Sequence, residues 1–283
     1  MAVTISPLSD ACGAEISGVD MKVRLSREDA AIIYQAWLDH LVIVIRDQQN
    51  LTPADQKTFC GNFGKIGEYN RPRERQHPKH ASDEIMLVSN VREDGQVIGA
   101  HPDGEMMWHT DTPYLRNPHK ATTLYAVEIP ETGGNTRFSN QYLVFEQLAQ
   151  KTREMLTGRQ AMNCYEFGTT VKDFDKYDRD KVPHYPHPVF RKHPETGKVA
   201  VYVCPLMTEE IIDLDETESR KLLEEIYSLQ RQSRFIYSHK WRVGDFVMWD
   251  NRCLLHARTD FPRTQRRLLR RVTVGDEAEV MAA

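Results

Sequence analysis

Two residues of the stretch Trp108-His109-Thr110-Asp111 have the types and the spacing of metal ligands. On an extended backbone, residues i and i+2 point to the same face, whereas on a helix they diverge. One histidine and one carboxylate leave a metal ion under-coordinated, so a second histidine must come from a distant part of the chain. His256, in the apolar, strand-like run 249–256, is the candidate. His109, Asp111 and His256 would form the two-histidine, one-carboxylate triad of non-haem Fe(II) sites.

A second triplet, His101-Pro102-Asp103, has the same spacing. A chain with 11 histidines is expected to contain about one such triplet by chance, so spacing alone is not specific. This triplet lies between Gly99 and Gly104, and its proline would remove a strand donor, which predicts a loop. His109 and Asp111 differ because His256 and Arg267 follow downstream. Arg267 could hold the far carboxylate of a diacid co-substrate through two hydrogen bonds.

At this point the chain resembles the taurine dioxygenase and 2,4-dichlorophenoxyacetate dioxygenase (TauD/TfdA-like) family of Fe(II)- and 2-oxoglutarate-dependent oxygenases. The resemblance covers nearly the whole chain. It is carried by residues 13–20, 108–111, 132–136 and 249–252, by His256, and by the pair Arg267 and Arg271. Several ordered motifs with matching gaps are far more specific than any single motif.

The resemblance implies a role for each of these residues. His109, Asp111 and His256 would hold Fe(II), and Thr136 and Arg267 would anchor the C5 carboxylate of 2-oxoglutarate. The loop at 64–78 supplies substrate contacts in related enzymes, which makes its Tyr69 and Asn70 substrate candidates. Glu105 stands where taurine-acting relatives carry an asparagine that touches the substrate amine, so a substrate other than taurine is expected.

The implied reaction is oxidation of a C–H bond, with hydroxylation favoured, coupled to conversion of 2-oxoglutarate and O2 to succinate and CO2. If residues 268–274 form a strand, Arg271 shares a face with Arg267 about 13 Å further along, so both would line one cavity at different depths. Arg271 is then expected to be the counter-charge of a small anionic substrate, a carboxylate, sulfonate or sulfate ester. Arg266 and Arg270, on the opposite face, are expected to form only surface salt bridges.

Two alternatives keep the shape but change the function. A cupin-like small-molecule binding protein without oxygenase activity would not need the full set of metal and diacid residues. A 2-oxoglutarate-dependent halogenase is disfavoured, because in such enzymes a small residue replaces the carboxylate that Asp111 provides. The residues do not distinguish hydroxylation from desaturation or from hydroxylation followed by cleavage.

Many short strands with a few helices predict a mainly β protein with flanking helices and a double-stranded β-helix, or jelly-roll, core. We expect one domain over residues 1–283. Helices are predicted after the N-cap Ser26, from Thr52-Pro53, over 140–156 and over 215–230. The main strands are predicted at 41–45, 84–90, 121–129, 136–139, 246–249, 254–256 and 268–274, with a turn-rich excursion at 91–99.

Composition excludes several classes of partner. The formal charge of −4 and pI near 6.3 give no basic stripe for nucleic acid. No apolar run approaches the roughly 20 residues that span a bilayer, and no signal peptide is visible, so a cytoplasmic protein is expected. The five cysteines are odd in number and lack Cys-x-x-Cys spacing, which predicts reduced thiols. A homo-oligomer is expected.

Three further histidines, His184, His187 and His193, invite a metal interpretation. Each neighbours a proline, so we predict an irregular surface insertion rather than a rigid ligand platform. Adventitious binding of a divalent ion in this segment stays open. Cys253, three residues before His256, is expected to be a small buried core residue rather than a ligand.

Overall fold

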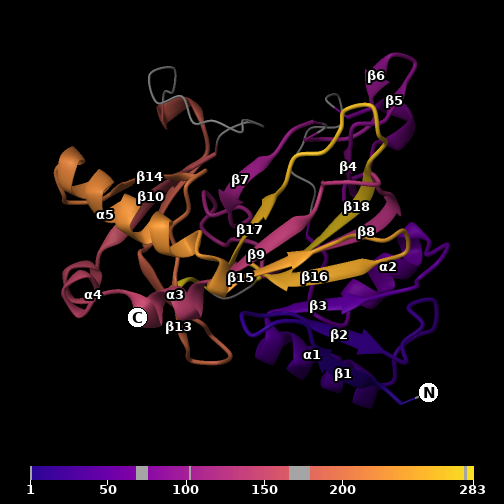
Figure 1. Cartoon of the computed structure of the whole chain (residues 1–283), viewed down its shortest axis with the longest axis horizontal. Helices are drawn as coiled ribbons and strands as arrows, with labels where there is room; N and C mark the ends of the chain where they lie inside the picture. Colours follow the sequence, from indigo (N-terminus) through magenta and orange to yellow (C-terminus); the bar gives the residue numbers. More distant parts are fainter. Residues whose placement is uncertain (1, 68–75, 102, 166–178, 277–278) are drawn as a thin grey trace.

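The computed structural model describes residues 2–67, 76–101, 103–165, 179–276 and 279–283. Tyr69 and Asn70 therefore lie outside the described residues. Two sheets dominate (Figure 1). In spatial order, the larger sheet contains β1 (Thr4–Pro7), β2 (Ala14–Ser17), β3 (Val42–Ile45), β16 (Phe246–Asp250), β8 (Ala121–Glu128), β18 (Leu268–Val274) and β4 (Met86–Ser89). The smaller sheet contains β15 (Ile236–His239), β9 (Thr136–Asn140), β17 (Leu254–Arg258) and β7 (Met106–His109).

The main hydrophobic core lies between these sheets. Val44, Leu124 and Leu269 of the larger sheet pack in one buried cluster with Phe138 and Leu254 of the smaller sheet. Within both sheets the pairings are antiparallel, except for β2 with β3. This arrangement gives the predicted mainly β protein with a jelly-roll core, and it leaves the inner faces of both sheets to hold functional side chains.

Two helices cover the outer face of the larger sheet. α1 (Arg27–His40) and α2 (Pro53–Cys60) bury Trp37 and Phe59 against strand residues such as Phe246. Ser26 caps α1 and Thr52 caps α2, each accepting a bond from the backbone N–H three residues on. Both predicted helix starts are confirmed, and the caps fix these helices on the side away from the inner faces.

A third hydrophobic cluster lies beside the smaller sheet. It joins α3 (Gln141–Gln147), α4 (Gln150–Leu156) and α5 (Glu216–Gln230) to the strands β10 (Gln160–Cys164), β12 (Phe190–Lys192), β13 (Val199–Val201) and β14 (Thr208–Ile211). The single helix predicted at 140–156 is wrong, because Leu148 and Ala149 are extended. The break lets Leu148 and Leu156 both point into this cluster, which periodicity alone does not reveal.

The histidine-rich segment is more ordered than predicted. His184 to Pro188 form the strand β11, which within the described part of the chain is an edge strand paired with β10, and an edge position tolerates prolines. His187 and His193 are buried, so the predicted surface insertion is wrong for this part. The smallest strands are β5 (Arg92–Glu93) and β6 (Gln96–Val97), which form a hairpin in the predicted turn-rich stretch, and β19 (Met281–Ala282).

Two composition-based expectations can be compared with the structure. No helix in the described part of the chain is long and apolar enough to cross a membrane. All five cysteines are buried, and none of them is joined to another in a disulfide bond.

Candidate metal centre and active site

The three predicted metal ligands meet between the two sheets. His109 ends β7, and His256 lies directly opposite it on β17. One ligand atom from each of His109, Asp111 and His256 can be chosen so that all three lie within 4.8 Å of one another. Asp111 was predicted to lie on the same strand as His109, and this is wrong. The strand β7 ends at His109, Asp111 follows in a bend, and Thr112 has a φ of 56°. The strand end and the bend together bring the carboxylate beside both imidazoles.

The hydrogen bonding of His109 prepares its ring for a metal ion. Its Nδ1 lies 2.7 Å from the carbonyl oxygen of Met107, which can only accept, so Nδ1 carries the proton. The lone pair of Nε2 is therefore free to bind a metal. Burial chiefly lowers the pKa of both His109 and His256, with Asp111 opposing it, and His109 lowers that of His256 further. Both rings are thus held in the neutral form that ligation requires.

Asp111 is held as a carboxylate by its neighbours. Oδ1 pairs with Arg271 Nη2 at 2.9 Å, and Oδ2 accepts from the Thr122 hydroxyl at 2.5 Å. Burial acts to raise the pKa of Asp111, but the charge of Arg271, together with the hydrogen bond from Thr122, opposes it, and that pKa lies well below its usual range. The site therefore contains one permanent negative charge beside two neutral imidazoles, which is the charge pattern of a divalent metal site.

A chain of hydrogen bonds orients this carboxylate. Trp249 Nε1 donates to Asn251 Oδ1 (3.0 Å), Asn251 Nδ2 donates to Thr122 Oγ1 (2.9 Å), and Thr122 donates in turn to Asp111. Thr110 donates to the carbonyl of Asn251 at 2.8 Å, which ties the bend to the same residue. The Trp249-Asp250-Asn251-Arg252 motif therefore supports the metal centre through Thr122, a residue that the sequence reasoning missed.

A buried cation without a counter-charge lies nearby. Arg267 is 2% exposed, and no carboxylate of the described residues lies within ion-pair distance of it. Its Nη2 donates to the Gly134 carbonyl at 3.2 Å, while its Nε has no partner in the described structure. Burial, and then Arg258, lower the pKa of Arg267. An anion bound here would supply the missing charge and hydrogen bonds.

The surroundings of Arg267 fit a carboxylate. Gly133 and Gly134 have φ values of 74° and 63°, as expected for the predicted tight turn. A Cβ on Gly133 would stand 2.2 Å from the carbonyl oxygen of Asp260, so this turn needs glycine. The Thr136 hydroxyl is buried and accepts a bond from Trp241 Nε1 at 3.0 Å, which leaves its proton to donate. Thr136 can therefore offer a donor to an anion.

The proposed substrate residues are placed unequally. Arg271 lies at the metal centre, and its Nη1 points to the sulfur of Met86 at 3.5 Å, a weak acceptor. The sequence reasoning assumed that Arg271 has no other partner. This was wrong, because its Nη2 pairs with Asp111. Glu105 is exposed, directly before β7.

Arg266, two residues before β18, and Arg270, on β18, differ from one another. Arg266 forms the predicted surface salt bridge with Glu128, through Nε at 2.6 Å and Nη2 at 2.9 Å. Arg270 does not: it lies 4.6 Å from the ring centre of Tyr125 and donates to the carbonyl of Leu51. The aliphatic part of the Arg270 side chain therefore packs on the face of the sheet that the helices cover.

The sequence reasoning missed another buried arginine, Arg258. Arg258 shares a strand face with His256, two residues earlier, and donates to the carbonyls of His101 (2.7 Å), Asp103 (2.8 Å) and Gly104 (3.0 Å). The His101 triplet is a loop, as predicted, and Arg258 holds this loop against β17. Burial, and then His109, lower the pKa of His101 to about 3. The i+2 spacing from His256 was the signal available in the sequence.

A second group of possible ligands, His193, Asp250 and Cys253, is already occupied by hydrogen bonds. His193 Nδ1 accepts from the backbone N–H groups of Glu195 and Thr196, and Nε2 lies 3.1 Å from Asp250. Asp250 also accepts three bonds from Arg252. With Cys253 these groups are close enough for a metal, but their polar atoms are already used, so the cluster is structural.

Non-haem iron oxygenases that use 2-oxoglutarate combine a ligand triad and a buried arginine within one jelly roll, and the protein is an enzyme of that class. Residues 4–273 match the family described as "Taurine catabolism dioxygenase TauD, TfdA family", so the chain belongs to this family. The resemblance found in the sequence is confirmed.

Individual relatives cover almost the whole chain. Pentalenolactone F synthase of Streptomyces avermitilis is 32% identical, with 98% of this chain and 95% of that protein aligned. The alpha-ketoglutarate-dependent 2,4-dichlorophenoxyacetate dioxygenase of Cupriavidus pinatubonensis is 30% identical, over 99% of this chain and all of that protein. The crystal structure of a taurine dioxygenase from Burkholderia xenovorans superposes with a TM-score of 0.81 at 27% identity, covering 100% of this chain and 95% of that one. The alternative interpretation, a cupin-like binding protein without oxygenase activity, is therefore wrong.

Proposed function

We propose that this dioxygenase oxidises a C–H bond of a small anionic substrate at a centre made by His109, Asp111 and His256. These three residues would hold Fe(II), and Arg267 with Thr136 would hold the C5 carboxylate of 2-oxoglutarate. The observation that carries the proposal is the buried guanidinium of Arg267, whose Nε lacks a partner in the described structure. The donor set of the triad, two imidazoles and a carboxylate, suits Fe(II).

When bound, iron and 2-oxoglutarate supply the activation of O2, with release of succinate and CO2. The residues of the chain bind, orient and exclude water. Thr122 and Arg271 hold the two oxygens of Asp111, and the Met107 carbonyl fixes the ring of His109. Because all three ligands are at most 9% exposed, the centre is largely screened from solvent.

The substrate class is proposed from Arg271. Its guanidinium lies at the metal centre, and among the described residues Nη1 has only the Met86 thioether as a partner, which an anionic group could replace. The substrate in the name of one relative agrees: 2,4-dichlorophenoxyacetate, on which the Cupriavidus enzyme acts, carries a carboxylate. We therefore propose a carboxylate, sulfonate or sulfate ester, with Glu105, Tyr69 and Asn70 as further contacts.

The test is a screen of small sulfonates, sulfate esters, aryloxyalkanoates and amino acids for substrate-dependent succinate release. Stimulation by an anion, with an increase of KM for that anion in Arg271→Met, would support the proposal. Stimulation only by neutral or cationic compounds would contradict it. Loss of iron binding in Arg271→Met, with no change in substrate affinity, would assign Arg271 to the support of Asp111 alone.

We also propose that the chain forms a single domain and acts in the cytoplasm as a homo-oligomer, without nucleic-acid or membrane partners. The five reduced cysteines and the absence of a basic stripe support the location and the partners. The exposed edge strand β1, whose four residues are all open to solvent, offers a surface for a second copy. Light scattering during size exclusion would test the oligomeric state, and a monomer at micromolar concentration would contradict it.

A further inference from the structure

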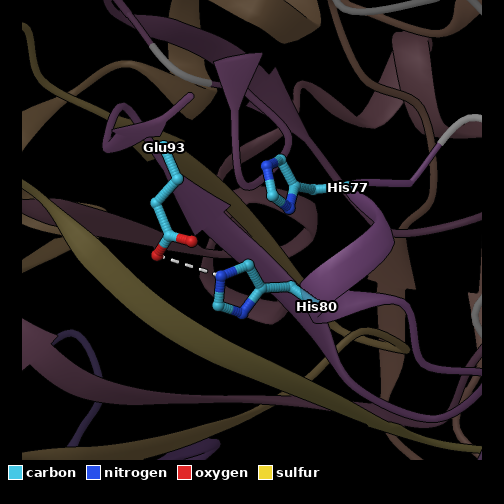
Figure 2. Close-up of side chains that lie close together, drawn as sticks. All are labelled: His77, His80 and Glu93. Atoms are coloured by element: carbon cyan, nitrogen blue, oxygen red, sulfur yellow. Dashed lines mark ion pairs between the residues drawn. The ribbon is translucent and has the colours of Figure 1, made fainter. Parts of the chain in front are cut away.

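Outside the metal centre and the His193 group, His77, His80 and Glu93 form a third cluster of possible ligands (Figure 2). One ligand atom from each residue can be chosen so that all three lie within 4.8 Å of one another. The cluster lies between the one-turn 3-10 helix η2 (Pro78–His80) and the hairpin β5–β6, which Figure 1 shows away from β7 and β17. It shares no residue with the His109 centre.

The two histidines have nitrogens without hydrogen bonds. His77 is 8% exposed, and its Nδ1 is buried with no partner among the described residues. His77 occupies the N-cap position of η2, yet its side chain makes no capping bond. His80 Nε2 lies 3.1 Å from Glu93 Oε1, a contact that is an ion pair only if the ring is protonated. A buried imidazole nitrogen without a partner is costly, and a metal ion would satisfy it.

The backbone fixes the third ligand. Glu93 pairs with Gln96 across a two-residue turn, and the turn residues Asp94 and Gly95 have φ values of 50° and 79°. Two left-handed residues are typical of a type I′ hairpin, which sets the strand register. Lys79, between the two histidines in sequence, pairs with Asp94 at 2.8 Å instead of with Glu93. The cluster therefore keeps one carboxylate beside two imidazoles.

We propose that His77, His80 and Glu93 bind one Zn²⁺ ion. Two imidazoles and one carboxylate form a known zinc ligand set that leaves a fourth position for water. The side chains of His80 and Glu93 are 31% and 38% exposed, so water can reach that position. Ligands at 2.1 Å around a tetrahedral ion stand about 3.4 Å apart, so the cluster needs to contract by at most about 1.4 Å. The bound ion would fasten η2 to the hairpin.

The test counts zinc by equilibrium dialysis followed by metal analysis, because Zn²⁺ can also occupy the His109 centre. The wild-type protein should bind two equivalents, and His80→Ala and Glu93→Gln should each bind one. His77 is left intact, since its buried ring is needed for packing. The matched controls are His184→Ala and Glu84→Gln, which remove an exposed histidine and an exposed carboxylate elsewhere and should keep two equivalents.

A second background separates the two sites and does not depend on the proposed oxygenase chemistry. The triple variant His109→Ala/Asp111→Ala/His256→Ala should keep one equivalent, and adding Glu93→Gln should remove it. Circular dichroism would establish that each variant is folded. Three results would each contradict the zinc site. They are one bound equivalent of zinc in the wild-type protein, two bound equivalents in His80→Ala or Glu93→Gln, and loss of an equivalent in a control variant.

Discussion

Replacing Arg267 by methionine should separate co-substrate binding from folding. Methionine fills much of the volume of the arginine stem but carries no charge, and the lost Nη2 bond to Gly134 is long at 3.2 Å. In the absence of an anion, the change removes a buried cation that has no carboxylate partner in the described structure. The variant should therefore fold with little loss of stability, because a buried unpaired charge opposes folding.

The effect on 2-oxoglutarate should be large. A bond between charged groups contributes about 1.5 to 3 kcal/mol, so losing the guanidinium contacts should cost about 3 kcal/mol, or roughly 150-fold in Kd. With 2-oxoglutarate at about 100 times the wild-type Kd, the ligand stabilises the wild-type protein by about 2.7 kcal/mol. At the same concentration it should stabilise the variant by only about 0.3 kcal/mol.

Thermal unfolding with and without 2-oxoglutarate, in the presence of Mn(II) to prevent turnover, measures this difference. The ligand should raise the Tm of the wild-type protein by about 5 °C and that of Arg267→Met by less than about 1 °C. Arg266→Met is the matched control, since Arg266 is the neighbouring residue and pairs with Glu128 at the surface. An unchanged Kd in Arg267→Met, or an equal loss in Arg266→Met, would refute the assignment of Arg267.

Four further outcomes are expected. Asp111→Ala should abolish substrate-dependent succinate formation while circular dichroism stays unchanged, because a ligand and not core volume is lost. Thr122→Val should weaken Fe(II) binding by about 10- to 100-fold in a metal titration, since it removes the donor that orients Asp111. Arg258→Met should speed deuterium exchange at 99–105 without changing Fe(II) affinity, because three carbonyls lose their donor. Burial lowers the pKa of His109 and His256 in the folded protein, so these histidines take up protons more readily in the unfolded state as the pH falls. The Tm of the metal-free protein should therefore fall between pH 7 and pH 5, and it should fall less in the double variant His109→Ala/His256→Ala.

Local patterns predicted much of the fold. Ser26 and Thr52 carry their capping chemistry in the sequence itself, and the continuous apolar run at β3 needs no distant information. The triad was also predictable, because two of its members are neighbours and the third follows a recognisable motif. These features depend on residues within a few positions of one another, where side-chain periodicity and hydrogen bonding decide the structure.

The wrong predictions concern features that depend on tertiary contacts. Nothing at Leu148-Ala149 marks a helix break, since neither residue is a glycine or proline, and the break exists because the core on both sides must be filled. The prolines of β11 suggested a loop, but an edge strand accepts them, and edge position is known only from the assembled sheet. The pairing of Arg271 with Asp111 likewise joins residues 160 positions apart.

The metal centre follows from how the two sheets divide their faces. Thr122 and Arg271 point inward from the larger sheet, and His256 and Arg258 point inward from the smaller one. A strand can deliver a ligand only along its own face, so β7 and β17 of the smaller sheet supply the two histidines, while the larger sheet supplies the groups that hold the carboxylate. Asp111 escapes this limit because it follows the end of β7, and a residue in a bend is free to turn between the sheets. That freedom explains why each oxygen needs a partner: the backbone does not fix the carboxylate, and the hydrogen bond from Thr122 and the ion pair with Arg271 do.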